Sequence, residues 1–440
     1  MIPTGARGSL LSTPDHALAL VEPNARIVAG SGCGTPTTLL AALSRRAEEV
    51  EGLHLLSGLL LGAHPFLDAV ATGSLRYTTW HVTSATRPLA SEGRAAIVPL
   101  RLSQVERSFE RQGVDVALVR VTPPGPDGTV SLGPSMAYAL AAVERAHVVI
   151  AEVDESLPFT HGPTQIPVER LSALVRSESP TPVHPSAEPD AVAMSIAQHI
   201  AGLLPQSPVL QIGLGRVPEA LVGTLGSADL GPLRFVGMGT DRMVDIAESG
   251  GLAAPHVSSD HGALCAVELM GSERLMRFAH QNPTVTVHPS REGHDPAWLA
   301  QRFDRFVSVN SAVEVDLHGQ ASSEVLLGQQ ISGIGGSADF ADAARLSAGG
   351  FAVIAMPAVS RDGSSRIVPR LPATSVVTLP RHAYGALVTE YGIADLRGLS
   401  LEERVESIIA VAHPEHRDRL WEQWRSLNRG DTEQDVGNSG

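Results

Sequence analysis

Short apolar runs alternate with helical patterns along most of this chain, and the alternation limits the folds open to it. Residues 114–121 form an apolar run that a Pro- and Gly-rich cluster ends, residues 136–146 have helical spacing, and residues 147–152 are apolar again. Strands and helices in such alternation are typical of a parallel sheet that is covered on both faces. The pattern therefore predicts an α/β fold with mostly parallel sheets.

The chain is too long for one ordinary core. Its 440 residues suggest two domains of roughly 200 residues each. Residues 176–190 contain four prolines and no apolar periodicity, which is typical of a linker. We therefore expect an N-terminal domain over residues 1–185 and a C-terminal domain over residues 186–428. Because the apolar pattern stops after Trp424, residues 429–440 are expected to form a flexible tail.

Charge and composition exclude several classes of function. The net charge of −14 and the pI near 5.6 disfavour nucleic acid or an anionic membrane as a partner. All 33 basic residues are arginines, which excludes a Schiff-base lysine and a P-loop lysine. Neither a signal peptide nor an apolar run long enough to span a membrane is present, so a cytoplasmic protein is expected.

Cysteine usage indicates no metal centre. Cys33 and Cys265 lie far apart and in no metal-ligand spacing, so we expect reduced thiols and no metal. Cys33 lies on a glycine-rich turn and could be a nucleophile, but a small buried side chain is the more ordinary interpretation. The glycines of that turn do not fit the spacing of a dinucleotide fingerprint, which argues against NAD.

Residues 207–246 contain the stretch best suited to a ligand site. A buried strand is predicted to end at a turn containing Gly213 and Gly215, and a helix follows. A second strand ends near Gly237 and Gly239, at a carboxyl end where open α/β sheets usually carry their ligand crevice. Such a turn would offer backbone N–H groups to an anion or a carbonyl oxygen, although many turns of this kind only connect a strand to a helix.

Five stretches together resemble the acetyl-CoA hydrolase/transferase family, which includes 4-hydroxybutyrate and acetate CoA-transferases. They are residues 123–133, 211–215, 309–320, 332–340 and 389–398, and the likeness extends from about residue 25 to about residue 422. The resemblance implies two open α/β/α domains with the active site in the cleft between them, and commonly a homodimer. It also implies an acyl-CoA thioester as substrate and a small-molecule acceptor.

Members of this family attack an acyl-CoA with a glutamate carboxylate, and the reaction passes through a mixed anhydride and a glutamyl-CoA thioester. Backbone N–H groups on glycine loops suit the negative charge that develops on the thioester oxygen. Asn310 matches the active-site asparagine of the family, although a turn amide is an alternative role for it. The resemblance assigns CoA binding to Gln211, Gly213, Gly215, Gly333, Gly335, Gly336, Asp339 and Phe340.

The sequence departs from the family pattern at the nucleophile. Met238, Asp241 and Asp245 keep the register of the family motif, and Gly237 falls where the glutamate is expected. A glycine cannot form an anhydride. Phe351 marks a second departure, because many relatives have a lysine there.

Three functions remain open on this basis. The main prediction is direct acyl transfer to water, an amine or an alcohol, with a general base drawn from Asp241, Glu390, His161, His261 or His280. The first alternative is an ordinary CoA-transferase whose nucleophile the sequence does not reveal. The second is a non-catalytic protein that binds CoA thioesters.

Overall fold

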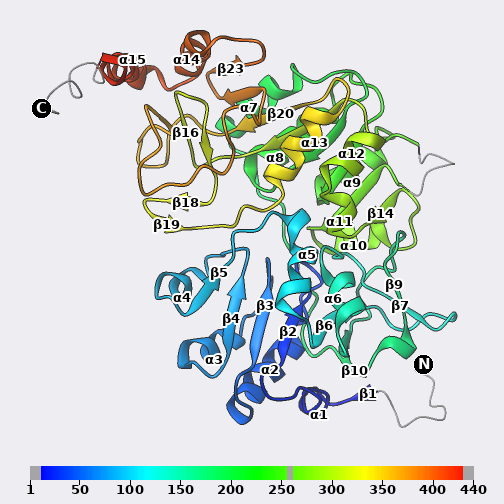
Figure 1. Cartoon of the computed structure of the whole chain (residues 1–440). Coiled ribbons are helices and arrows are strands. Elements are labelled where there is room, and N and C mark those ends of the chain that lie inside the picture. The colour runs from blue at the N-terminus through cyan, green and yellow to red at the C-terminus, as the bar shows by residue number, and fades with distance from the viewer. Residues whose placement is uncertain (1–10, 255–260, 430–440) are drawn as a thin grey trace, which may run out of the picture.

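The chain forms two α/β lobes, one above the other, each built around an eight-stranded sheet (Figure 1). The structure is a computed structural model and describes residues 11–254 and 261–429. The predicted fold class is confirmed, because both sheets are largely parallel.

The sheet of the N-terminal lobe has the strand order β1-β10-β8-β6-β2-β3-β4-β5, and all its neighbouring strands are parallel. Its strands are β1 (Leu11–Ser12), β2 (Arg26–Ala29), β3 (His54–Ser57), β4 (Arg76–Thr79), β5 (Ala95–Ile97), β6 (Val116–Val121), β8 (Val148–Val153) and β10 (Ala173–Arg176). Its helices are α1 (Pro14–Leu18), α2 (Thr37–Glu49), α3 (Phe66–Thr72), α4 (Arg87–Ser91), α5 (Leu102–Gln112) and α6 (Ala139–Arg145). A short ribbon of β7 (Thr129–Ser131) and β9 (Gln165–Pro167) and the 3₁₀ turn Val168–Arg170 complete the lobe.

The sheet of the C-terminal lobe has the order β14-β13-β12-β11-β15-β20-β22-β23, and only β23 runs antiparallel to its neighbour. Its strands are β11 (Val209–Ile212), β12 (Arg234–Gly239), β13 (Leu264–Leu269), β14 (Val285–Val287), β15 (Phe306–Asn310), β20 (Phe351–Ala355), β22 (Ala386–Thr389) and β23 (Gly392–Asp395). Its helices are α7 (Ala191–Ala201), α8 (Arg216–Leu225), α9 (Asp241–Glu248), α10 (Glu273–Ala279), α11 (Ser290–Gly293), α12 (Pro296–Arg302), α13 (Ser337–Leu346), α14 (Leu401–Ala410) and α15 (Pro414–Arg429).

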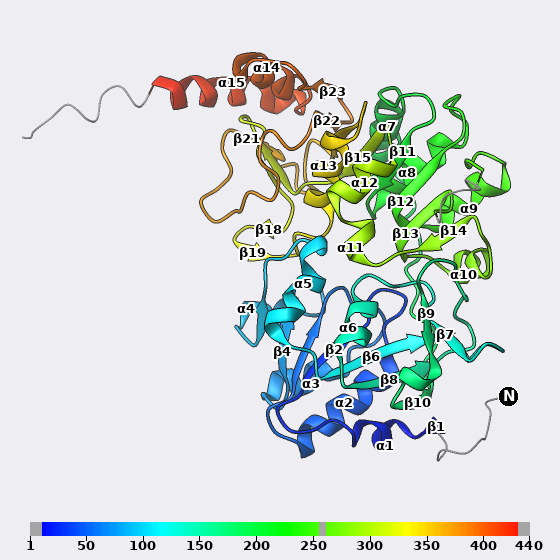
Figure 2. The same ribbon diagram turned by 45° about the vertical axis from the view of Figure 1, so that its right-hand side comes forward.

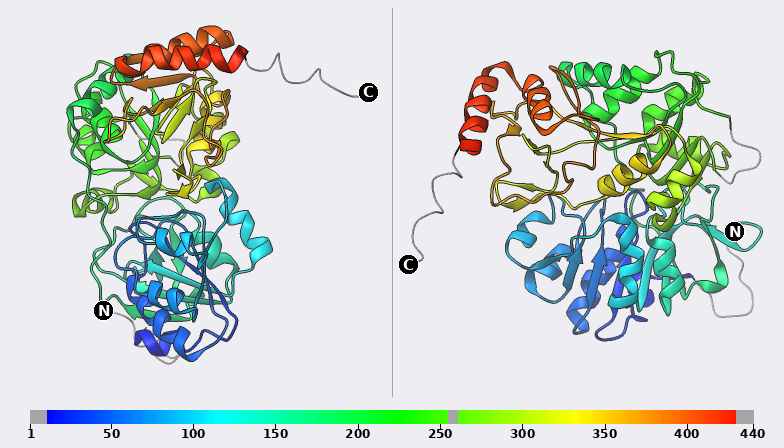
Figure 3. Two further views of the ribbon diagram at one scale, coloured as in Figure 1. Left: turned by 90° about the vertical axis from the view of Figure 1, so that its left-hand side faces the viewer. Right: turned by 45° about the horizontal axis from the view of Figure 1, so that its top comes forward.

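A loop-rich segment beside this sheet carries the short strands β16 (Glu314–Asp316), β17 (Ala321–Ser322), β18 (Val325–Leu326), β19 (Gln329–Gln330) and β21 (Ile367–Val368). In the view turned by 45°, α5 lies at the junction of the two lobes, below β18 and β19 (Figure 2). Helices α14 and α15 lie at the end of the molecule farthest from the N-terminal lobe (Figure 3).

The apolar runs became strands because they are buried on both faces. Every residue of β6, β11, β13 and β20 is buried, as expected for central strands of a covered parallel sheet. One hydrophobic cluster contains Val119 and Trp80 of the first lobe together with Phe235 and Val267 of the second. The two lobes therefore share apolar packing, which fixes the strand ends that face each other.

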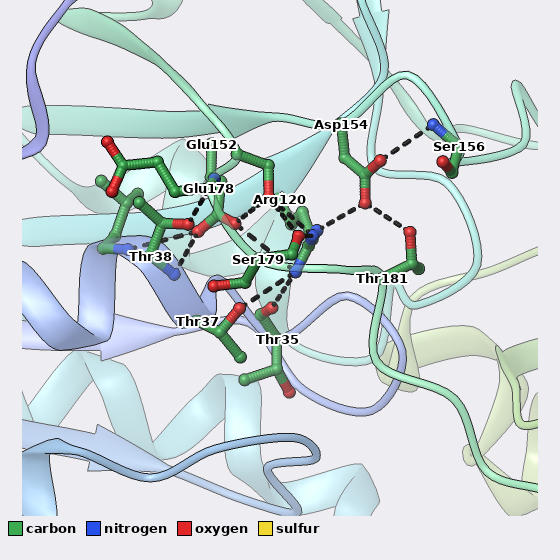
Figure 4. A network of polar contacts seen from close by, with 12 residues as sticks. Thr35, Thr37, Thr38, Arg120, Glu152, Asp154, Ser156, Glu178, Ser179 and Thr181 are labelled. Carbon is green, nitrogen blue, oxygen red and sulfur yellow. Dashed lines mark hydrogen bonds and ion pairs between the residues drawn. The ribbon is translucent and has the colours of Figure 1, made fainter.

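A buried arginine anchors the segment that joins the lobes. Arg120 on β6 is 1% exposed, and its Nε donates to Asp154 Oδ2 at 2.8 Å. Its Nη2 donates to Ser177 Oγ and to the Ser179 carbonyl oxygen, both at 2.7 Å. Glu152 lies 3.4 Å from the same guanidinium (Figure 4). The connecting segment after β10 is therefore tied to the sheet of the N-terminal lobe.

The C-terminal end differs from the sequence-based expectation. Helix α15 continues to Arg429, five residues beyond Trp424, because the last turns of an amphipathic helix can be polar all round once its earlier turns are packed. The remainder of the predicted tail, residues 430–440, lies outside the described residues. Across the described ranges, no helix has the length and apolar character needed to cross a membrane.

Candidate active site

A pocket of about 340 Å³ lies where the carboxyl ends of the two sheets meet. Ser31 follows β2, and Trp80 and His81 follow β4, on the side of the N-terminal lobe. On the other side, Gly213 follows β11 and Asn310 ends β15. The strand ends of open α/β sheets are the usual place for a ligand crevice, so the pocket is the candidate active site.

Gly237 lies in the wall of this pocket, on β12. Its φ of +92° is in the left-handed region, and a Cβ there would lie 2.7 Å from Phe340 Cζ and 3.4 Å from Gln211 Cγ. The absence of a side chain at Gly237 therefore does not open space at that point, because the Phe340 ring already reaches it.

Glu268 on β13 points a carboxyl group into the same pocket, and the sequence analysis missed it. The register shift between β12 and β13 after Gly237 pairs Glu268 with Met238, the next residue of β12. The carboxylate thus lies one strand away from the position where the family resemblance expects a glutamate. The only available sequence signal was a single acidic residue inside the apolar run 263–270.

Two serines of the N-terminal lobe hold the Glu268 carboxyl group. Ser31 Oγ and Ser135 Oγ donate to Oε1 at 2.5 Å and 3.0 Å. Glu268 is 7% exposed, and burial raises the pKa of its carboxyl group, although the two serine hydrogen bonds act in the opposite direction. A carboxyl group of the second lobe is therefore oriented by hydroxyl groups of the first.

Gln211 and Asn310 form a polar pair in the pocket wall. Asn310 Nδ2 donates to Gln211 Oε1 at 2.9 Å, and Gln211 Nε2 donates to Asn310 Oδ1 at 3.3 Å. Ser308 Oγ also donates to Gln211 Oε1, at 2.9 Å. This network fixes both amides beside Gly213 and Gly237, and it brings together two residues that were predicted for different roles.

The glycine loop 333–336 also lines the pocket, but two of its members serve the contact between the lobes. A Cβ at Gly333 would lie 2.0 Å from the Trp80 carbonyl oxygen. Leu102 N–H donates to the Gly335 carbonyl oxygen at 3.1 Å. Gly336 is the N-cap of α13 and makes no side-chain cap hydrogen bond, and the first turn of that helix lines the pocket through Gly336 and Ser337.

The turn after β11 offers fewer donors than expected. Gly213 N–H donates to the Val309 carbonyl oxygen at 3.1 Å and so belongs to the sheet. Gly215 has a φ of +121° and open space beside it, but it is outside the pocket lining. The turn lies where the sequence predicted it. The pairing of β11 with β15 determines that the Gly213 amide is used inside the sheet.

Three carboxylates that were predicted for the site are not part of the pocket lining. Each of them has a structural hydrogen-bond partner instead. Asp241 accepts hydrogen bonds from the Ser272 amide and hydroxyl groups, at 2.9 Å and 2.8 Å. Glu390 accepts from the Ala358 amide at 2.9 Å. Asp339 is fully buried, accepts from the Ser103 amide and hydroxyl groups, and has a pKa raised by burial to about 6. Asp339 therefore joins α13 to α5 across the contact between the lobes.

The three histidines proposed as bases lie outside the pocket lining, which instead contains His81 and His294. Burial lowers the pKa of His81 to about 4 and that of His294 to about 3, so both imidazoles are neutral at pH 7. His280 Nδ1 accepts from the Phe159 amide at 3.2 Å. His161 pairs with Thr286 in an isolated bridge, and His261 lies three residues before β13.

Two α/β lobes, each with a largely parallel sheet, thus enclose a pocket lined by a buried carboxyl group and by the amino end of α13, which is the architecture of a two-lobed α/β protein. Residues 9–185 match the acetyl-CoA hydrolase/transferase N-terminal domain, and residues 271–424 match the C-terminal domain of the same family. The chain belongs to the acetyl-CoA hydrolase/transferase family.

Relatives and solved structures agree with this assignment. The chain is 32% identical to the 4-hydroxybutyrate coenzyme A transferase of Clostridium kluyveri, over 94% of this chain and 97% of that one. It is 31% identical to the butyryl-CoA:acetate CoA-transferase of Anaerostipes caccae, over 95% and 98% of the two chains. Among solved structures, RipA from Yersinia pestis superposes with a TM-score of 0.88 at 28% identity, covering 95% of this chain and 97% of the other.

A glutamate placed at position 237 is expected to destabilise the protein and to give no gain in turnover. A left-handed φ costs a side chain roughly 1–2 kcal/mol, and overlap with Phe340 adds about 1–3 kcal/mol. We expect Gly237→Glu and Gly237→Ala both to lower the midpoint of chemical unfolding. Gly73→Ala is the matched control, since Gly73 has a left-handed φ of +86° and open space beside it, and it should cost only the first contribution. Turnover by Gly237→Glu above that of the native chain would contradict the expectation.

Proposed function

We propose that this protein transfers CoA between an acyl-CoA and a carboxylic acid, with Glu268 as the nucleophile in place of a glutamate at position 237. The observation that carries the proposal is the Glu268 carboxyl group, buried in the interdomain pocket and oriented by two serines. The two relatives described above are named as CoA-transferases, which supports this reaction over the main prediction made from sequence.

The chemistry balances with one carboxylate. The Glu268 carboxylate attacks the thioester carbonyl carbon and expels the CoA thiolate, which leaves an acyl-glutamyl anhydride. The thiolate then attacks the glutamyl carbonyl carbon and releases the first carboxylate, so that CoA is carried as a glutamyl thioester. An incoming carboxylate reverses these two steps with its own acyl group and restores Glu268.

The amino end of α13 is suited to the developing oxyanion. Gly336 and Ser337 line the pocket, and the helix has no side-chain cap on its first N–H groups. Such groups carry the positive end of the helix dipole and stabilise negative charge without reorganisation. The Gln211–Asn310 pair supplies further fixed amide groups in the same wall.

A second candidate is hydrolysis, with Glu268 as a general base that deprotonates water. The raised pKa of the buried carboxyl group favours it, because a base works best when its pKa approaches the working pH. Hydrolysis is also the direct acyl transfer to water that formed part of the main prediction from sequence. The chain is also 27% identical to an acetyl-CoA hydrolase of Candida albicans, over 71% of this chain and 66% of the relative.

Trapping distinguishes the two candidates. The protein is incubated with butyryl-CoA with or without acetate, quenched with borohydride or hydroxylamine, digested, and analysed by mass spectrometry. For transfer, we expect a modified peptide containing Glu268, acetate-dependent formation of acetyl-CoA, and no label in Glu268→Gln. Acetate-independent CoA release with no modified peptide would support hydrolysis. A label on Asp241, Glu390 or Asp339 would overturn the assignment of Glu268.

A further inference from the structure

A compact group of nitrogen and sulfur ligands lies around β13, outside the pocket lining. It consists of His261, Cys265 and His288, each offering one ligand atom, and these atoms all lie within 4.8 Å of one another. Cys265 belongs to β13, His261 precedes that strand, and His288 follows β14. The group is separate from the proposed catalytic carboxylate, because none of its members lines the pocket.

The hydrogen bonding of the group is incomplete. Cys265 is a free thiol and 1% exposed, and His288 is 2% exposed. His261 Nδ1 and His288 Nε2 are both buried and have no hydrogen-bond partner within the described ranges. Leaving a buried polar atom unpaired costs about 1–3 kcal/mol. A single cation coordinated by both nitrogens and the sulfur would remove this cost.

The remaining groups around the cluster fit a metal. His288 Nδ1 lies 3.0 Å from Glu292 Oε2, which leaves Nε2 facing the cluster. A carboxylate on the second nitrogen of a metal-binding histidine is the usual means of orienting it. Trp298 and Phe303 pack against His261 at ring distances of 4.9 Å and 6.2 Å and shield the group from solvent.

We propose that His261, Cys265 and His288 bind a zinc-type divalent cation. Thiolate and imidazole are the ligands that Zn²⁺ prefers in proteins, and a fourth position would be left for water. A tetrahedral zinc would hold these atoms roughly 3.3–3.6 Å apart, so small side-chain rotations would close the present spacing. The ion would tie the start of β13 to the end of β14.

The spacing of the two cysteines does not reveal this group, because its other two members are histidines. His261 lies four residues before Cys265 on the same segment, and His288 follows the neighbouring parallel strand β14.

Cobalt is the probe for this site, because a cobalt–thiolate bond gives a charge-transfer band in the near ultraviolet. The full-length chain is stripped with a chelator, dialysed, and titrated with Co²⁺, and bound Zn²⁺ is measured separately after gel filtration. We expect one ion per chain, a thiolate band, and a higher unfolding temperature with Zn²⁺ than with chelator. The chain provides a matched control, since Cys33→Ser removes the only other thiol and should keep the band.

Cys265→Ser should abolish the band, and His261→Gln, at a partly exposed position, should weaken binding at least about tenfold. If Cys265→Ser does not fold, the His261→Gln titration decides. A native chain that shows neither a band nor retained Zn²⁺ would overturn the proposal. A band that survives in folded Cys265→Ser would overturn it as well.

Discussion

Glu268→Gln is expected to lower kcat for CoA transfer by at least about 10³-fold, because removal of a covalent nucleophile typically leaves only the contribution of substrate binding and oxyanion stabilisation. The glutamine keeps the shape of the side chain and can still accept from Ser31 and Ser135. The loss should therefore appear in kcat without a comparable loss of stability.

The pH profile gives an independent readout of the same residue. Attack requires the ionised carboxylate, and burial raises the pKa of Glu268 above its ordinary value of 4.5. The acid limb of kcat/KM should therefore fall as pH decreases through a value above 4.5 in the native chain. Glu268→Asp should have a low kcat/KM and should still show an acid limb in its pH profile.

Glu106→Gln is the matched control for this experiment. Glu106 is also buried with a pKa raised by burial, but it pairs with Arg291 and is outside the pocket lining. It should change kcat less than about threefold, since substitutions away from the reacting atoms leave the transition state intact. Full activity in Glu268→Gln would show that the nucleophile lies elsewhere.

Arg120→Leu is expected to lower the free energy of unfolding by about 3–5 kcal/mol, because breaking a buried ion pair leaves uncompensated charge. Its guanidinium forms ion pairs with Asp154 and Glu152, and it donates to the Thr35 carbonyl oxygen and to Ser177. All of these groups lie inside the N-terminal lobe or on the segment that leaves it. Guanidinium chloride unfolding followed by circular dichroism measures the effect.

Arg274→Leu provides the comparison. Arg274 also contacts two carboxylates, Asp245 and Glu248, at 2.5 Å and 2.6 Å, but its side chain is 40% exposed. Exposed pairs contribute about 0–1 kcal/mol, so this variant should unfold nearly as the native chain does. Equal destabilisation by the two substitutions would show that burial does not determine the strength of the Arg120 network.

Much of the architecture could be predicted because it depends on local patterns. The apolar run 114–121 became β6 (Val116–Val121), and the proline-rich segment 176–190 became the irregular connection after β10. Burial on both faces leaves a continuous apolar run, which is visible in one sequence. Element ends moved by one to three residues, because capping and packing rather than periodicity decide where a helix or strand ends.

The candidate site was less predictable. Asn310, Gln211 and Gly237 meet in the pocket as the resemblance implies, whereas Asp241 and Glu390 hold turns and helix ends elsewhere. Each of these carboxylates looks the same in sequence as a catalytic one. The difference lies in their partners, which come from residues distant along the chain or across a turn.

By itself, the sequence determined the α/β class and the family, because both depend on patterns of residues close together in the chain. Only the tertiary structure decided that Glu268 on β13 lies opposite Met238 on β12, in the wall of the same pocket as Gly237, and that His288 lies near Cys265. Neighbouring strands of a parallel sheet are joined by long crossovers, so the residues that meet across them are set by strand register and not by spacing.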